Sequence, residues 1–351
     1  MDLNLRSDLT ALDPKNMLGL IEGFPQQCRT ALSIAQAFEF EPAMQAPNVV
    51  VLCGMGGSAA GGDFVRAIYE AEASVPFQVV RDYDLPNFVD ARSLVFIASY
   101  SGNTEETLSA YHQAQARGAT IITVTSGGEI GRLSHEHGHR VITVPGGQPP
   151  RSALGLMLIP VLWASQGLGL ISQQDYEAAF AGLDRVGAEL GPDAADNAAM
   201  KLAKDVVGKV TVCYGLGGYR GYIANRWRCQ FNENAKFLLF ANAFPELCHN
   251  EIMGWVAAEK QAGNYAAIVL EDGHESVRMS TRAAVTADVI GAEKVTFHHV
   301  RGSGERLLEK MLTLTFIGDW VSIYSARLNE VDPTQIENID RLKDALASLD
   351  N

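Results

Sequence analysis

Ser99-Tyr100-Ser101-Gly102-Asn103-Thr104-Glu105-Glu106-Thr107 joins an apolar run to a helical pattern, and this junction decides the fold. The run before it, Leu94 to Ala98, predicts a buried strand of a parallel sheet. Backbone N–H groups and the positive end of the helix dipole meet at such a junction, which predicts a site for a dianion such as a phosphate monoester. An ordinary helix cap, Ser or Thr followed by Glu, is the alternative. Four side chains here carry hydroxyl groups: Ser99, Ser101, Thr104 and Thr107.

A glycine-rich turn lies upstream, after the apolar run Val49 to Cys53. It reads Gly54-Met55-Gly56-Gly57-Ser58-Ala59-Ala60-Gly61-Gly62-Asp63. A dinucleotide site is one interpretation, but the glycine spacing differs from the nucleotide fingerprint, and the next strand ends in Arg81-Asp82-Tyr83 without a clean acidic ribose ligand. Together, the two turns suit a small phosphorylated ligand better.

The composition describes an acidic globular protein of 351 residues, long enough for two domains. Hydrophobic residues make up 47% and charged residues 20%, which allows a large core. A net charge of −13 argues against nucleic acid and anionic membranes as partners. The five cysteines form no close CxxC pair, and Met1 to Asp13 lacks an apolar signal core, so we expect reduced thiols and a cytoplasmic location.

The stretch from Ser152 to Gln174 contains no charged residue and is long enough to suggest a membrane span. Pro160 interrupts it, and polar residues such as Ser165 and Gln166 lie within it. We therefore expect a buried helix at a domain or subunit interface.

Strands and helices alternate from about Pro47 to Gly146, which predicts a parallel sheet covered on both faces. The pattern restarts at Lys209 to Tyr214, followed by Gly215-Leu216-Gly217-Gly218-Tyr219, and this echo predicts a tandem repeat. The second copy lacks the serine-rich turn, so we expect it to keep the fold without the phosphate site. The predicted class is α/β, with two doubly wound, flavodoxin-like parallel sheets. The expected segments are a helical arm at 1–45, a first domain at 46–170, a helical connector at 171–207 and a second domain at 208–351.

Four charged or titratable residues outside the turns are candidates for chemistry. Arg151 is either a surface charge or a ligand for phosphate or an enediolate, because its guanidinium is permanently charged and multidentate. Glu233, among asparagines beside an apolar segment, is either a surface carboxylate or a base whose pKa partial burial raises. His249 can be structural or catalytic, and Lys343 by itself indicates an exposed helical lysine. The cluster His135, His137 and His139 fits a solvated turn better than a metal site.

These turns resemble the sugar isomerase (SIS) domain and, more closely, the bifunctional phosphoglucose/phosphomannose isomerases of archaea and bacteria. The resemblance continues in Asn-Glu-Asn-Ala-Lys at 232–236 and in Pro-Glu-Leu-x-His-Asn-Glu at 245–251. It also includes an Asp-Pro turn followed by a helix with the pattern Ile-x-x-Leu-Lys, whose lysine is Lys343. Cys248 departs from the pattern, which implies a small polar residue such as Asn at that position.

The resemblance implies an aldose–ketose isomerase that interconverts glucose 6-phosphate, and mannose 6-phosphate, with fructose 6-phosphate through a cis-enediol. It implies no metal and no cofactor, and it suggests a homodimer. Glu233 would move the proton between C1 and C2, His249 and Lys343 would open the ring, and Arg151 would stabilise the enediolate. The implied ligands of the 6-phosphate are Gly56, Gly57, Ser58, Ser99, Ser101 and Thr104.

Two alternatives remain open at this point. One is another sugar-phosphate isomerase, of the aminosugar or heptose type, which shares the serine-rich turn without the Glu233 and His249 pair. The other is a non-catalytic module that senses phosphosugars.

Overall fold

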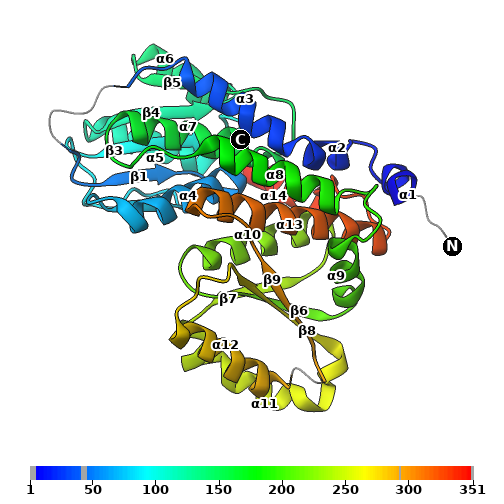
Figure 1. Cartoon of the computed structure of the whole chain (residues 1–351). Coiled ribbons are helices and arrows are strands. Elements are labelled where there is room, and N and C mark those ends of the chain that lie inside the picture. The colour runs from blue at the N-terminus through cyan, green and yellow to red at the C-terminus, as the bar shows by residue number, and fades with distance from the viewer. Residues whose placement is uncertain (1–4, 41–45, 292–293, 349–351) are drawn as a thin grey trace. The chain divides into compact units, whose positions relative to one another are not determined.

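A computed structural model describes residues 5–40, 46–291 and 294–348 of the chain (Figure 1). Its contacts divide the chain into two compact units. The first-sheet unit comprises Gly23–Asp184 and Ser303–Thr313, and the second-sheet unit comprises Met1–Glu22, Arg185–Gly302 and Leu314–Asn351. The units interleave along the chain, whereas the sequence predicts consecutive segments.

The first-sheet unit contains five parallel strands in the order β2-β1-β3-β4-β5. Their runs of β-branched and apolar residues favour strands that are buried on both faces. The sequence predicts strands at Val49–Cys53, Phe77–Arg81, Leu94–Ala98, Thr120–Thr125 and Arg140–Val144, and the ends of the observed strands lie within one residue of these. The bounds are β1 Val50–Cys53, β2 Phe77–Val80, β3 Leu94–Ser99, β4 Thr120–Thr125 and β5 Arg140–Thr143.

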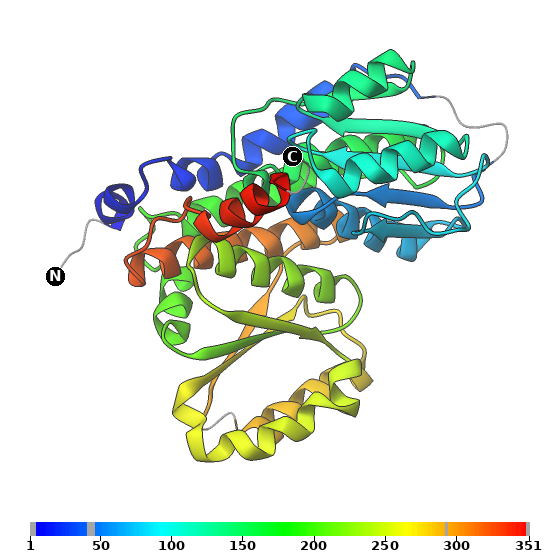
Figure 2. The same cartoon turned by 180° about the vertical axis from the view of Figure 1, so that it is seen from behind.

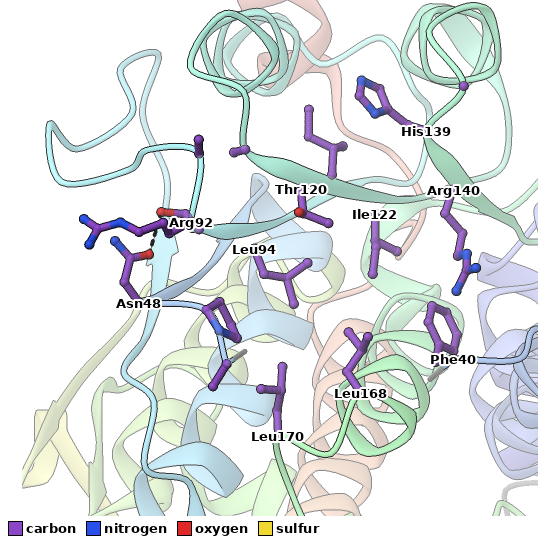
Figure 3. Close-up of a pocket in the computed structure, with 17 residues that line it drawn as sticks. Phe40, Asn48, Arg92, Leu94, Thr120, Ile122, His139, Arg140, Leu168 and Leu170 are labelled. Carbon is purple, nitrogen blue, oxygen red and sulfur yellow. Dashed lines mark hydrogen bonds between the residues drawn. The ribbon is translucent and has the colours of Figure 1, made fainter. Parts of the chain in front are cut away.

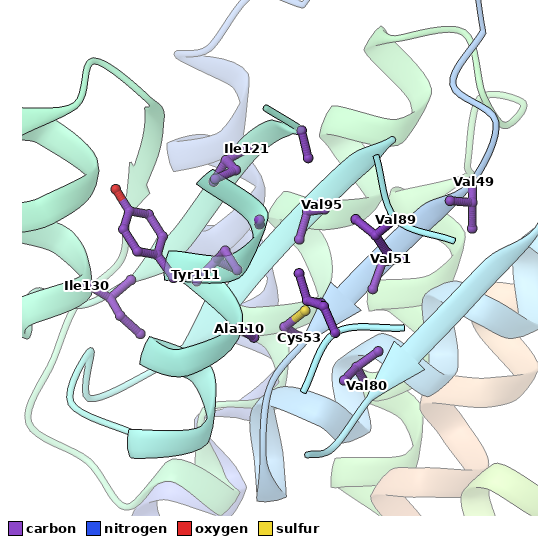
Figure 4. Packing of buried hydrophobic residues seen from close by; sticks show 14 residues of the cluster. Val49, Val51, Cys53, Val80, Val89, Val95, Ala110, Tyr111, Ile121 and Ile130 are labelled. Atoms are coloured by element: carbon purple, nitrogen blue, oxygen red, sulfur yellow. The ribbon is translucent and has the colours of Figure 1, made fainter. Parts of the chain in front are cut away.

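Helices cover both faces of this sheet, because successive strand residues point to opposite sides. On one face, Val51 and Val95 pack with Tyr111 of α5 (Glu105–Ala116) and Ile130 of α6 (Gly128–Glu136), as Figure 4 shows. On the other face, Leu52 contacts Gly62 of α4 (Gly56–Glu72). The predicted doubly wound arrangement is confirmed, and it places the carboxyl ends of the strands along one edge.

Helix α7, Leu154–Gly167, accounts for most of the uncharged stretch and contains Pro160 within it. It is apolar on all sides and packs on α4, on β3 and β4, and on α3 (Phe24–Gln36). The predicted burial of this helix is confirmed. Its packing within the first-sheet unit accounts for the burial, so no domain or subunit interface has to be invoked to explain it. Among the described residues, no helix combines the length and apolar character that crossing a bilayer requires.

The second-sheet unit repeats this topology with four parallel strands in the order β7-β6-β8-β9. Figure 2 shows α10 (Tyr219–Asn234) on one face of the sheet and α12 (Val277–Ile290) on the other. The predicted repeat is therefore confirmed. The bounds are β6 Val210–Gly215, β7 Leu239–Ala243, β8 Tyr265–Glu271 and β9 Thr296–Arg301.

The sequence did not predict β7, an edge strand that leaves Phe240 48% exposed. Helix α10 packs closely on α13 (Leu307–Leu328), where the Trp227 indole donates to the carbonyl of Leu314 at 3.0 Å. The other helices are α1 Leu5–Leu12, α2 Met17–Glu22, α8 Tyr176–Leu190, α9 Ala198–Val206, α11 Trp255–Ala258 and α14 Glu337–Ala347, with short 3₁₀ turns at Pro150–Ser152, Glu246–His249, Glu251–Gly254 and Glu259–Asn264.

Candidate functional site

The hydroxyl turn at the carboxyl end of β3 is held by its own side chains. Ser99 Oγ accepts the Gly102 N–H at 3.1 Å and lies 3.0 Å from Thr104 Oγ1. Ser101 Oγ accepts the Asn103 N–H at 3.3 Å, and the Ser101 side chain is exposed. The turn therefore holds three hydroxyl groups in fixed positions near the positive end of α5, of which that of Ser101 is exposed and that of Ser99 is buried.

Thr104 occupies the N-cap position of α5, yet its side chain makes no capping hydrogen bond. Its hydroxyl turns toward Ser99 instead. The helix-cap interpretation of this junction is therefore wrong. Thr107 Oγ1, one turn further along, is buried without a hydrogen-bond partner among the described residues.

The glycine-rich turn is itself the beginning of a helix. The sequence pattern predicts a helix over Gly61–Glu72, whereas α4 already starts at Gly56. Gly56, Gly57 and Ser58 therefore form its first turn, where backbone N–H groups lack intrahelical acceptors. Ser58 is buried, and its Oγ accepts the Tyr100 N–H at 3.2 Å. This hydrogen bond ties the two turns together, so the amides of one lie near the hydroxyl groups of the other.

Arg151 lies beside the glycine-rich turn. A Cβ atom on Gly57 would be 2.4 Å from the carbonyl oxygen of Pro150, so only glycine allows this approach. Arg151 follows in a 3₁₀ turn before α7 and is 3% exposed. The surface-charge interpretation of Arg151 is therefore wrong.

Tyr100 is a residue that the sequence analysis missed. Its hydroxyl donates to the Pro145 carbonyl at 2.9 Å and accepts the Gln148 N–H at 3.4 Å. Burial raises the pKa of this phenol. The side chain joins the hydroxyl turn to the segment that leads to Arg151, and an aromatic residue inside a polar turn was the available signal.

Glu233 lies in the last turn of α10, in the second-sheet unit, and is half-buried. Its neighbours fix the turn: Asn232 Oδ1 accepts the Leu239 N–H at 3.0 Å, and Asn234 Nδ2 donates to Ser322 Oγ at 3.0 Å. The asparagines around Glu233 are thus structural partners of α13 and β7, and they hold its carboxylate on an ordered turn.

His249 lies at the opposite edge of the second sheet. It is exposed and ends a 3₁₀ turn after the carboxyl end of β7, whereas Glu233 precedes the amino end of that strand. At about 3.3 Å per residue, the five residues of β7 span roughly 13–17 Å, and Glu233 and His249 lie beyond opposite ends of this strand. The second-sheet unit therefore does not bring Glu233 and His249 together.

Lys343 lies on α14, with a side chain that is 67% exposed and 4.0 Å from Asp340. The histidine cluster is a turn whose His137 Nδ1 lies 2.8 Å from the Tyr111 hydroxyl. No group of side chains suited to a metal ion occurs among the described residues.

A cavity of about 750 Å³ opens at the amino edge of the first sheet (Figure 3). Its floor includes Leu94, Ile122 and Leu168, and Arg140 stacks on Phe40 at its rim. Because the strands begin here, the cavity lies at the edge of the sheet opposite the hydroxyl turn and does not belong to the candidate site.

Comparisons with known proteins agree with this layout. The SIS domain family matches residues 44–161, and the bacterial phospho-glucose isomerase C-terminal SIS domain family matches residues 195–346. The chain is 36% identical to the bifunctional phosphoglucose/phosphomannose isomerase of Caldicellulosiruptor bescii, covering 95% of this chain and 99% of that relative. It is 34% identical to the isomerase of the same name from Aquifex aeolicus, covering 85% and 90%.

A solved structure shares the fold at lower identity. A hypothetical protein from Thermus thermophilus superposes with a TM-score of 0.76 at 14% identity, covering 98% of this chain and 93% of that one. At this identity, the likeness supports the architecture alone.

Proposed function

Since the chain belongs to the bifunctional phosphoglucose/phosphomannose isomerase family, we propose that it interconverts glucose 6-phosphate and mannose 6-phosphate with fructose 6-phosphate. The observation that carries the proposal is the uncapped hydroxyl turn, tied to the first turn of α4 and flanked by the buried Arg151. The reaction belongs to glycolysis and gluconeogenesis. All five cysteines are unpaired, which supports a cytoplasmic location.

The 6-phosphate binds in the first-sheet unit. Hydroxyl groups of Ser99, Ser101 and Thr104 donate to its oxygens, and the amides of Gly56 and Gly57 add donors at a helix N-terminus. This binding is remote from C1 and C2, so it orients the reacting carbons without taking part in proton transfer.

Glu233 carries the proton between the carbons. Its carboxylate removes the C2 proton of the open-chain aldose, and the electrons form the cis-enediolate as the carbonyl at C1 becomes an oxyanion. A proton then moves from the C2 hydroxyl to the C1 oxyanion, and returning the abstracted proton to C1 gives the ketose, with its carbonyl at C2. Arg151 stabilises the negative charge on the enediolate oxygens. In the preceding ring opening the C1–O5 bond breaks, the C1 hydroxyl loses its proton and O5 gains one, and His249 and Lys343 serve these two transfers.

The separation of Glu233 and His249 favours a homodimer in which His249 acts in the site of the neighbouring copy. Each of the variants Glu233→Gln and His249→Ala should be inactive alone. After subunits are exchanged between the two, half the dimers are mixed and each mixed dimer has one intact site, so about a quarter of wild-type activity should return. No recovery would place both residues of a site in one chain.

The isomerase assignment is tested by following both hexose 6-phosphates in a coupled assay. The Glu233→Gln variant should lose about a thousandfold in kcat, because a general base contributes up to about four orders of magnitude. The exposed Glu337 provides a matched control, and Glu337→Gln should keep normal turnover. Activity should also survive a metal chelator, because the proposed proton transfers use no metal.

The same assay separates the alternatives. Turnover of glucosamine 6-phosphate with none of either hexose phosphate would favour an aminosugar enzyme. Binding of fructose 6-phosphate without turnover, retained in Glu233→Gln, would favour a sensor.

A further inference from the structure

We propose that Lys236 is a positioning residue that holds the turn carrying Glu233 against the turn that leads into α14. This inference rests on the proposed role of Glu233 as the base. It concerns the second-sheet unit alone, where all the groups involved lie.

The backbone of Lys236 is in the left-handed region, with φ of 51°. It directly follows Ala235, the C-cap of α10, at a position where glycine is the usual residue because it lacks a Cβ atom. The chain reverses here, and the Phe231 carbonyl accepts the N–H groups of both Ala235 and Phe237. A lysine at such a position needs a compensating interaction.

The ammonium group of Lys236 supplies that interaction. Nζ donates to the Glu233 carbonyl at 2.9 Å and to the Asn234 carbonyl at 3.5 Å. Both carbonyls belong to the end of α10, where acceptors lack intrahelical donors and a positive charge is favoured by the helix dipole. The side chain therefore caps the turn that presents the Glu233 carboxylate.

Nζ also donates to the Asp332 carbonyl, 96 residues further along the chain. Asp332 begins a rigid turn, since its Oδ1 accepts the Thr334 N–H at 2.7 Å and Pro333 and Thr334 are buried. Helix α14, which carries Lys343, starts three residues after Thr334. A parallel tie runs from Asn329 Nδ2 to the Ala235 carbonyl at 2.9 Å.

One ammonium thus fixes the base-bearing turn relative to the segment that leads to Lys343. Proton transfer between adjacent carbons depends steeply on the placement of the base, and a shift of about 1 Å can cost about a hundredfold in rate. Substrate affinity depends mainly on the phosphate site, which lies in the other unit. Loss of Lys236 should therefore lower kcat far more than it raises KM.

The experiment compares Lys236→Met, Lys236→Gly and Lys236→Arg with the wild type. The Met and Gly variants should lose about 10- to 100-fold in kcat, with KM within about threefold, and Arg should recover part of the loss. With glucose 6-phosphate deuterated at C2, the kinetic isotope effect on kcat should rise in the Met and Gly variants, because proton abstraction becomes more rate-limiting. A change in overall stability alone would not move that ratio.

Lys236→Gly separates the ammonium from the backbone, because glycine relieves the left-handed conformation while removing the hydrogen bonds. Glu330 also has a positive φ, of 54°, and Glu330→Gly is the matched control, with unchanged kcat and isotope effect. A Lys236→Gly variant with wild-type kcat and isotope effect would overturn the positioning role. A wild-type protein without isomerase activity would instead overturn the proposed function.

Discussion

The turn after β3 and the turn after β8 occupy the same place in two copies of one topology, but they carry opposite chemistry. Both begin at the last strand residue, Ser99 or Glu271, and both reach the N-cap of the next helix five residues later, at Thr104 or Ser276. In the first copy, the N-cap hydroxyl pairs with Ser99 and leaves the helix uncapped. In the second, Ser276 accepts the Met279 N–H and caps α12.

The second turn also provides its own anions. Arg220, in the first turn of α10, forms ion pairs with Asp272 and Glu275. Tyr219 stands at the sequence position that corresponds to Ser58, after the paired glycines, and its hydroxyl donates to Asp272 Oδ2 at 2.6 Å. Carboxylates of the chain therefore lie beside the first turn of α10, at the place that corresponds to the proposed phosphate site of the first copy. If the proposed phosphate site is correct, the shared backbone sets where an anion lies, and the side chains decide whether that anion is a carboxylate of the chain or a bound ligand.

We expect the largest effect from a carboxylate placed in the turn after β3, which would make this turn resemble the turn after β8. Ser101→Asp should lower kcat/KM for fructose 6-phosphate by about a thousandfold, because like charges facing each other cost several kcal/mol. Ser101 is exposed, so the variant should fold, and Ser101→Ala is the control with a loss of about tenfold. A Ser101→Asp variant with a normal KM would remove this turn from the phosphate site.

We expect the second-largest effect from removing Arg220, the cation that pairs with the carboxylates of the turn after β8. Arg220→Met should destabilise the protein by about 3 kcal/mol at pH 7, because it leaves the buried Asp272 without its partner. Measured urea midpoints should show the loss. Substitution of the exposed Arg278 by Met is the control, and equal midpoints for the two variants would contradict the internal-anion role.

The ion pair of Arg220 with Asp272 also predicts that the stability of the protein depends on pH. Burial raises the pKa of Asp272, but hydrogen bonds from Tyr219 and the His274 N–H and the ion pair with Arg220 outweigh it and hold the pKa well below its usual range. A lowered folded-state pKa stabilises the protein above the unfolded value of about 3.9, and this stability is lost as the pH falls through the folded value. The difference between wild type and Arg220→Met should therefore shrink on acidification below about pH 4. A constant difference across that range would contradict the prediction.

We expect the smallest effects from substituting the two N-cap residues, Thr104 and Ser276, because one substitution should change substrate binding and the other stability. Thr104→Ala should raise KM about tenfold with little change in stability, because its hydroxyl makes no cap. Ser276→Ala should cost about 1 kcal/mol of stability and leave KM unchanged. Steady-state kinetics and thermal unfolding of both variants test the pair, and a Thr104→Ala variant with an unchanged KM and a stability loss as large as that of Ser276→Ala would contradict the prediction.

The sequence predicts the sheets well because buried parallel strands are apolar throughout. It fails where the signal depends on context. Edge strand β7 exposes Phe240, so it lacks a continuous buried pattern. The sequence does not predict the start of α4, because Gly56 and Gly57 have low helix propensity. It also does not predict the position of Arg151, because this depends on the close approach of Pro150 to Gly57, which no local pattern indicates.

The site residues show the same limit. Ser58, Ser99, Ser101 and Thr104 follow from strand-to-helix junctions, so their proximity was predictable. The distance between Glu233 and His249 was not, because it depends on recognising β7 as the strand that carries the chain from one edge of the sheet to the other.

The interleaving of the two units limits how the chain can be divided. Arg6 pairs with Asp193 in the second-sheet unit, while Arg306 pairs with Asp175 in the first. Cutting the chain at any point in 171–207 would therefore separate residues 1–22 from most of the second-sheet unit, and residues 303–313 from most of the first-sheet unit. The two copies share one topology, but neither corresponds to a continuous segment of the chain that could be expressed by itself with all of its packing.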